Sequence, residues 1–228
     1  MKQITTLTFF TFKKNKFWAL QQIGMAPKKL KKPKGLEFFK FLGTGGDQGF
    51  SLIPDFSTYA FLGVWKNRKD FKKCINTHNV FLEYKEKANF QRDLELVSIK
   101  SHGLWDGKNP FINQDINFIN THKKKAVVLT RATINWNRLI QFWKSVPKAS
   151  KAIEKACGVE YFKGVGEWPF IQQATISIWN NFDSVNNFAY KDKSHSDIVK
   201  TTHQEKWYKE DLFSRFYLLS DTTTNLDK

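Results

Sequence analysis

The sequence predicts an α+β fold in which one structural unit occurs twice, and two observations carry this prediction. A block of the pattern G-[LV]-E-[FY]-F-K stands at residues 35–40 and returns at residues 158–163. Each block leads through a glycine-rich segment to a β-rich run that ends in tryptophan, at 59–65 in the first half and 174–179 in the second. Self-similarity in this order indicates two copies of one unit.

The elements around these blocks also correspond. Both halves open with a β-rich run followed by an aromatic stretch of helical character: 3–12 with 17–20, and 126–134 with 139–143. After each tryptophan-ending run, apolar residues recur at helical spacing, over 71–78 and over 185–202. Each unit therefore has the order β-α-β-β-α, the split βαβ layout of ferredoxin-like units. Two such units favour a pseudo-dimeric α+β barrel, in which a gap between helices and sheet can hold a flat cofactor.

We expect three parts along the chain. Residues 1–122 form the first ferredoxin-like repeat together with a linker and lid, and residues 123–220 form the second repeat. Within the first part, residues 88–122 break the symmetry, and 103–111 are predicted to be the ordered linker and lid. Residues 221–228 are polar, which predicts a frayed tail.

Composition limits the class of protein. The chain has 228 residues, enough for a substantial core, and an aromatic share of 16%, which needs partners in a core, a ligand cavity or an oligomer face. Its two cysteines form neither a disulfide framework nor a metal-site pattern with histidine. Because there is no secretory leader pattern and no apolar run of ~20 residues, we expect a cytoplasmic protein.

The net charge of +16 is concentrated in short lysine runs. Such runs are typical of solvated loops, and no nucleic-acid-binding motif accompanies them, which disfavours a nucleic-acid partner. Anionic lipid attracts near-surface lysine, so peripheral contact with an anionic membrane is the alternative.

Several stretches, taken in order, resemble the spheroidene monooxygenase family of carotenoid biosynthesis. They are 49–55 with 59–65, 103–107 with 110–111, 129–134, 142–143 with 146–147, 164–167, 174–179, 188–190 with His195, 207–208, Glu210 and 213–216. The resemblance implies a haem protein that uses O₂ and an external electron donor, such as a ferredoxin, to place oxygen on an acyclic carotenoid, giving a keto product. The lysine-rich insertion at 26–34 departs from the pattern and leaves the substrate open. The alternative is a non-catalytic barrel that binds a small hydrophobic ligand or an acidic partner.

Arg131 is the first candidate site residue, with a catalytic or cofactor-binding role. It shares one face of a strand with Val127, Leu129 and Thr133. An arginine on such a face needs an anion. A haem propionate, a bound oxygen species or a structural carboxylate such as Glu167 would each serve.

The candidate substrate pocket includes Thr175, Ser177 and Trp179, which share a face more polar than that of Phe61, Gly63 and Trp65 in the first half. Small hydroxyls also pack within sheets, so packing remains the alternative. Trp105 would either contact a polyene chain or plug the linker onto the barrel.

His195 is the candidate axial ligand of a haem iron. Ser194 and Asp197 have capping-box spacing, and Ile198, Val199 and Thr202 then place His195 on a buried helical stripe. Neutral imidazole is a common iron ligand. The resemblance supports this role, because His195 follows 188–190 as in the family pattern, with Phe188 beside the cofactor. His78, on a comparable stripe of the first half, is the rival ligand.

Overall fold

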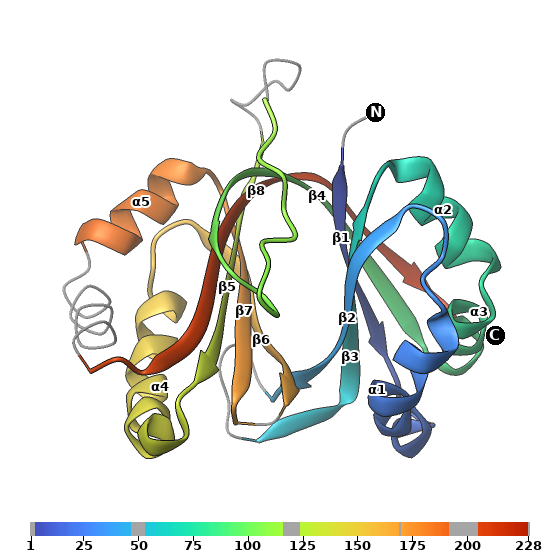
Figure 1. Ribbon diagram of the computed structural model, residues 1–228, viewed down its shortest axis with the longest axis horizontal. Coiled ribbons are helices and arrows are strands. Elements are labelled where there is room, and N and C mark those ends of the chain that lie inside the picture. The colour runs from blue at the N-terminus through green and yellow to red at the C-terminus, as the bar shows by residue number, and fades with distance from the viewer. Residues whose placement is uncertain (1–2, 47–52, 116–123, 169, 192–204, 228) are drawn as a thin grey trace.

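The computed structural model describes residues 3–46, 53–115, 124–168, 170–191 and 205–227. In this part of the chain, antiparallel strands close into a barrel of order β1-β3-β2-β6-β7-β5-β8-β4. The helices cover the outside of the barrel on two opposite sides (Figure 1). The predicted duplicated α+β barrel is confirmed.

The first half contains β1 (Ile4–Thr11), α1 (Lys16–Leu30), β2 (Leu36–Gly45), β3 (Pro54–Trp65), α2 (Arg68–Thr77), α3 (Asn79–Lys87) and β4 (Phe90–Gly103). The second half contains β5 (Ala126–Ile134), a short 3-10 helix (Trp136–Arg138), α4 (Leu139–Glu154), β6 (Val159–Trp168), β7 (Gln172–Trp179), α5 (Phe182–Lys191) and β8 (Tyr208–Asn225). The strand order is β4-β1-β3-β2 in one half and β8-β5-β7-β6 in the other, so both halves have the same topology.

The duplication extends to local geometry. Gly35 and Gly158, which open the repeated blocks, have φ values of 79° and 85°, a region that favours glycine. A Cβ at Gly35 would collide with Asp70 of α2, and a Cβ at Gly158 would collide with Ser184 of α5. Glycine is therefore needed twice for the same reason, since each block passes closely under the next helix of its own half.

Two predictions about the chain's organisation are wrong. Residues 88–122 do not all break the symmetry, because residues 90–103 form β4, the counterpart of β8. The tail is not frayed from residue 221, because β8 continues to Asn225 and pairs with the beginning of β4. Asp221 forms an ion pair of 2.7 Å with Arg92 across this pairing. Cross-strand contacts thus hold a polar segment that has little strand propensity of its own.

Three layers of side chains make up the core. Alternate strand residues fill the barrel interior, among them Leu7, Leu62, Leu129 and Ile176. The outward-facing residues of the first half pack under α1, α2 and α3, and those of the second half pack under α4 and α5. None of the described helices combines the length and apolar character needed to cross a bilayer.

Candidate functional site

The predicted site residues lie on two faces of the barrel wall. Successive strand residues point to opposite faces. Arg131 accompanies Leu129 on the interior face, where Trp105 of the linker also packs. Thr175 and Trp179 share the helix-covered face, opposite to the interior residues Ile176 and Ile178. The structure therefore separates Arg131 and Trp105 from the predicted pocket residues of β7.

Arg131 meets a carboxylate of the protein itself. Its side chain is 2% exposed and pairs with Glu210 of β8. Glu210 also accepts hydrogen bonds from the backbone N–H groups of Gly107 (2.8 Å) and Asp106 (3.1 Å) in the linker. Partial burial raises the pKa of Glu210, but these hydrogen bonds and the Arg131 charge outweigh it, so the pKa lies below its ordinary value. The partner is Glu210, whereas Glu167 was the carboxylate suggested by the sequence.

Trp105 plugs the linker onto the barrel. The ring lies 5.5 Å from that of Phe38 in an edge-on contact, and its Nε1 donates to Glu167 Oε1 at 2.7 Å. Lys40 pairs with the other carboxylate oxygen of Glu167. The Arg131 guanidinium lies 5.5 Å from the Trp105 ring centre. These contacts match the structural alternative for Trp105, with the side chain 1% exposed.

The helix-covered face of the second half is much less filled than its counterpart in the first. The repeat and the strand registers align β3 with β7 without a gap, so each residue of one strand has a counterpart in the other. Large rings of the first half correspond to small or polar side chains of the second: Phe10 to Ala132, Phe41 to Gly164, Tyr59 to Gln173 and Phe61 to Thr175. The same backbone thus carries far less side-chain volume under α4 and α5.

Two threonines lie at the centre of this less filled face. Thr130 and Thr175 lie directly opposite each other in the β5–β7 register. Thr130 is exposed although it sits in the middle of a barrel strand, whereas its counterpart Thr8 is fully buried. Thr175 is buried, and its hydroxyl has no hydrogen-bond partner among the described residues. Solvent therefore reaches the sheet at Thr130, beside a buried hydroxyl that has no partner among the described residues.

Ser177, Trp179 and Phe188 form the floor of this region. Trp179 Nε1 donates to Ser177 Oγ at 2.8 Å, so Ser177 already has a partner. Phe188 of α5 lies against Trp179 with the ring centres 5.3 Å apart. Of the three β7 residues predicted to line a pocket, Thr175 is the one whose polar group is available.

Arg215 of β8 is a candidate binding residue that the sequence analysis did not single out. It lies opposite Val128 in the register, which places it on the helix-covered face. The guanidinium lies 5.6 Å from the Phe213 ring and 5.9 Å from the Phe182 ring, and Nε has no acceptor among the described residues. An arginine embedded between rings with a buried, unmatched N–H is suited to an anionic group of a ligand.

In the first half, the position that corresponds to Arg215 holds a charged residue with oppositely charged partners. The counterpart of Arg215 is Glu95, which lies opposite Thr6, the counterpart of Val128. Glu95 is buried and pairs with Arg68 at 2.6 Å and Lys72 at 2.8 Å, both from α2. Within the described chain no acidic side chain pairs with Arg215, so the second half has a cation where the first has a neutralised carboxylate.

The histidines are placed as follows. His195 lies four residues after the end of α5, outside the described residues. His78 is not on a buried helical stripe, because α2 ends before it and α3 begins after it. Its Nδ1 accepts the N–H of Val80 at 3.3 Å as a helix cap. Among the described residues, no three histidine, cysteine, aspartate or glutamate side chains form a metal-binding group.

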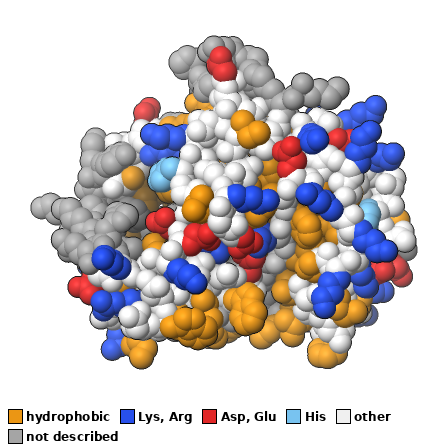
Figure 2. All heavy atoms as spheres, in the orientation of Figure 1, with side chains coloured by type: hydrophobic (Ala, Val, Ile, Leu, Met, Phe, Trp, Pro, Cys, Tyr) orange, Lys and Arg blue, Asp and Glu red, His pale blue; other side chains and the backbone are white. Residues whose placement is uncertain are grey.

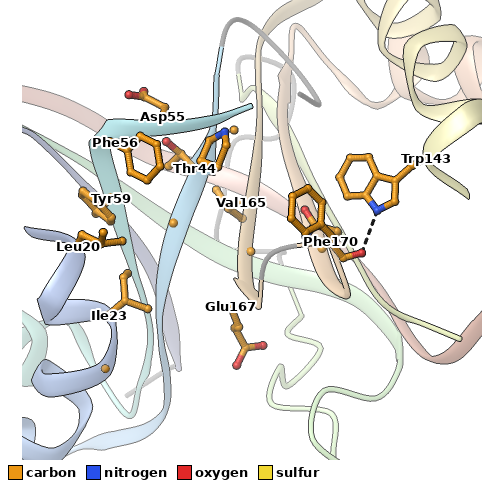
Figure 3. A pocket seen from close by; sticks show the side chains of 16 residues that line it. Leu20, Ile23, Thr44, Asp55, Phe56, Tyr59, Trp143, Val165, Glu167 and Phe170 are labelled. Carbon is orange, nitrogen blue, oxygen red and sulfur yellow. Dashed lines mark hydrogen bonds between the residues drawn. The ribbon is translucent and has the colours of Figure 1, made fainter. Parts of the chain in front are cut away.

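A groove lies where the two halves of the barrel meet. This seam groove has a volume of about 370 Å³ and runs between α1 and α4 over the β2–β6 junction (Figure 3). Leu20, Ile23, Phe56 and Phe170 line it with mostly apolar surface, and Trp143 Nε1 donates to the Phe170 carbonyl at 3.0 Å along one side.

No protein-family model matches the chain. Spheroidene monooxygenase of Cereibacter sphaeroides is 31% identical over 223 residues, which cover 95% of this chain and 67% of that protein. Spheroidene monooxygenase of Rhodobacter capsulatus is 28% identical over 202 residues, covering 89% and 83% respectively. Among solved structures, an aldoxime dehydratase has a TM-score of 0.67 at 10% identity, covering 98% of this chain and 85% of that one. The last similarity supports the fold.

Proposed function

The chain belongs to the spheroidene monooxygenase family of oxidoreductases, and from this premise we propose that it oxidises an acyclic carotenoid, or a similar long apolar molecule, to a keto product. We propose further that a haem is held between the second-half sheet and its helices. The observation that carries this proposal is the replacement of first-half rings by Ala132, Gly164, Gln173 and Thr175 at matching register positions.

The residues present fit a flat, dianionic macrocycle. The side chains at these positions are smaller than the first-half rings, and Trp179 and Phe188 provide apolar rings on the same face. Arg215 offers a half-buried guanidinium, whose Nε has no acceptor among the described residues, for a propionate. The region therefore supplies an apolar bed and a basic group on one face of one sheet, which is what a haem requires.

The protein residues would divide the work as follows. His195 would hold the haem iron, a role that rests on the family pattern, and Val185 and Phe188 of α5 would pack beside the haem against Trp179. Thr175 and Thr130 would hydrogen-bond an oxygen atom near the sheet. A bound haem supplies O₂ activation with electrons from an external donor such as a ferredoxin.

Arg131 receives a positioning role in this account. Its pairing with Glu210 joins β5 to β8, and Glu210 in turn holds the linker backbone at Asp106 and Gly107. Arg131 and Trp105 thus close the barrel interior, on the opposite side of the wall from the proposed cofactor.

The test is an absorbance spectrum of the full chain purified with haem supplied. We expect a Soret band in the wild type and in His78→Ala, and its loss or displacement in His195→Ala. Arg215→Gln should keep the band position but weaken haem affinity by about tenfold or more, as expected for one lost charge-assisted contact. A wild type without a Soret band, or an unchanged band in His195→Ala, would overturn the haem assignment. Oxygen incorporation into an acyclic carotenoid, followed by mass spectrometry, tests the reaction.

A further inference from the structure

Large apolar side chains are exposed at one end of the barrel. The register places the end of β2 beside the start of β3, and the end of β6 beside the start of β7, while β2 and β6 meet at Gly43 and Gly166. The first turns of α1 and α4 follow β1 and β5 at this same end. We call this end the apolar rim. Its exposed members include Phe17, Phe56, Trp136, Ile140, Trp168 and Phe170.

These side chains are exposed to an unusual degree. Trp136 is 75% exposed, Phe17 74%, Ile140 73% and Trp168 66%. Figure 2 shows hydrophobic side chains gathered along the lower edge of the molecule, in the orientation in which Figure 1 places the starts of α1 and α4. Scattered surface hydrophobics are normal, but a contiguous group drawn from several segments marks an interaction surface.

The lysines around the rim favour an anionic lipid surface over a second copy of the chain as the partner. Lys14 and Lys16 are exposed immediately before Phe17, and Lys144 is exposed one turn after Ile140, whereas Lys13 is paired with Asp227. A second copy of a chain with net charge +16 would bring like charges together. An anionic lipid surface attracts these lysines, while tryptophan and phenylalanine partition into its interface.

We propose that the apolar rim docks onto the surface of an anionic lipid bilayer. The seam groove opens on this surface, because Leu20, Phe56 and Phe170 both line the groove and are exposed (Figure 3). Tyr59 also lines the groove; it is buried, and its hydroxyl has no partner in the described chain. An apolar molecule dissolved in the lipid would enter through the seam groove, and its polar end would accept a hydrogen bond from the Tyr59 hydroxyl. This last point rests on the proposed function, whereas the docking itself does not.

The experiment is sedimentation of the full chain with vesicles, without substrate. One vesicle type contains phosphatidylcholine with phosphatidylglycerol, and the other contains phosphatidylcholine alone. We expect binding to the anionic vesicles, weakened by salt, together with a blue shift of tryptophan emission as Trp136 and Trp168 leave water. Ile140→Ser combined with Trp136→Ser should lower vesicle affinity by at least about tenfold.

The matched control is Ile112→Ser. Ile112 is 59% exposed, but its N–H bonds Gln3, which precedes β1 at the opposite end of the barrel. This variant should bind vesicles like the wild type. Failure of the wild type to bind, or an equal loss in Ile112→Ser, would overturn the proposal. A concentration-dependent dimer that disappears in the rim variant, without vesicle binding, would assign the rim to a second copy. Because no turnover is measured, these outcomes are separate from those of the oxidation proposal.

Discussion

The two helix–sheet layers are built on strands of the same order and register, yet one is a closed core and the other is open. In the first half, the Phe61 ring lies 4.8 Å from Phe81 and 5.0 Å from Phe41, and it is fully buried. In the second half, Thr175 stands at the same position beside exposed Thr130. The comparison teaches that the barrel closes through its backbone pairing and interior face, so that the outer layer can differ between the two copies.

The two layers also differ in whether their charged residue has an oppositely charged partner. Glu95 is neutralised by Arg68 and Lys72 of the covering helix, whereas Arg215 lies among rings. Arg215 is half-buried, and its Nε is buried without an acceptor among the described residues. A buried donor without an acceptor is costly, which favours a ligand at this position. The first-half layer thus has its charge neutralised by its own helix, and the second-half layer is the one for which we propose a ligand.

The largest expected effect is on the first-half core. Phe61→Ala should lower the free energy of unfolding by about 3–5 kcal/mol, because it removes a fully buried ring from an aromatic cluster. Thr175→Ala, at the matching position, should change it by less than about 1 kcal/mol, because the hydroxyl has no partner to lose. Denaturant unfolding of both variants measures the difference, and similar losses in the two would contradict the comparison.

Acid should act on the first-half layer through Glu95. Burial raises the pKa of Glu95, but hydrogen bonds and charge from Arg68 and Lys72 outweigh it and lower the pKa below its ordinary value. A lowered pKa contributes stability that is present above the unfolded value, about 4.3, and is lost as pH falls through the folded value. Glu95→Gln should therefore flatten the acid limb of the stability curve, measured by unfolding at a series of pH values. An unchanged slope would show that the pair contributes nothing.

A smaller effect is expected at Ser177. Ser177→Ala leaves buried Trp179 Nε1 without its acceptor and should cost about 1 kcal/mol in unfolding free energy. In the first half the matching residue is Gly63, and Trp65 Nε1 bonds Thr6 Oγ1 at 3.0 Å instead. Ser177→Thr, which keeps a hydroxyl, is the control. A Ser177→Ala variant as stable as the wild type would mean that water replaces the hydroxyl as the acceptor of Trp179 Nε1.

The sequence predicted the duplication because its signals are local. The repeated block, the glycines and the tryptophan-ending strands can each be recognised within a few residues. Strands β4 and β8 were missed, since segments such as 90–95 and 221–225 are polar and are held as strands by pairing with each other and, for 90–95, with β1. That pairing joins residues more than a hundred positions apart, which no local pattern carries.

The candidate site was predictable in part. Period-two alternation correctly placed Arg131 on an apolar face in need of an anion, but not its partner Glu210, which only the β5–β8 register brings near. Thr175 was recognised as polar where Phe61 is aromatic. Arg215 became a candidate binding residue only when the strand register matched it to Glu95. The role of His195 stays a prediction, because the residue lies outside the described chain.

The central claim is that missing side-chain volume in the second-half layer is what makes room for the cofactor. Thr175→Phe restores the ring found at Phe61 and tests this most directly, with haem titrated into the full chain and followed by its Soret band. The account predicts that Thr175→Phe folds as stably as the wild type but loses haem affinity by about tenfold or more, while Thr175→Ser binds normally. Haem uptake by a folded Thr175→Phe protein at wild-type affinity would contradict it.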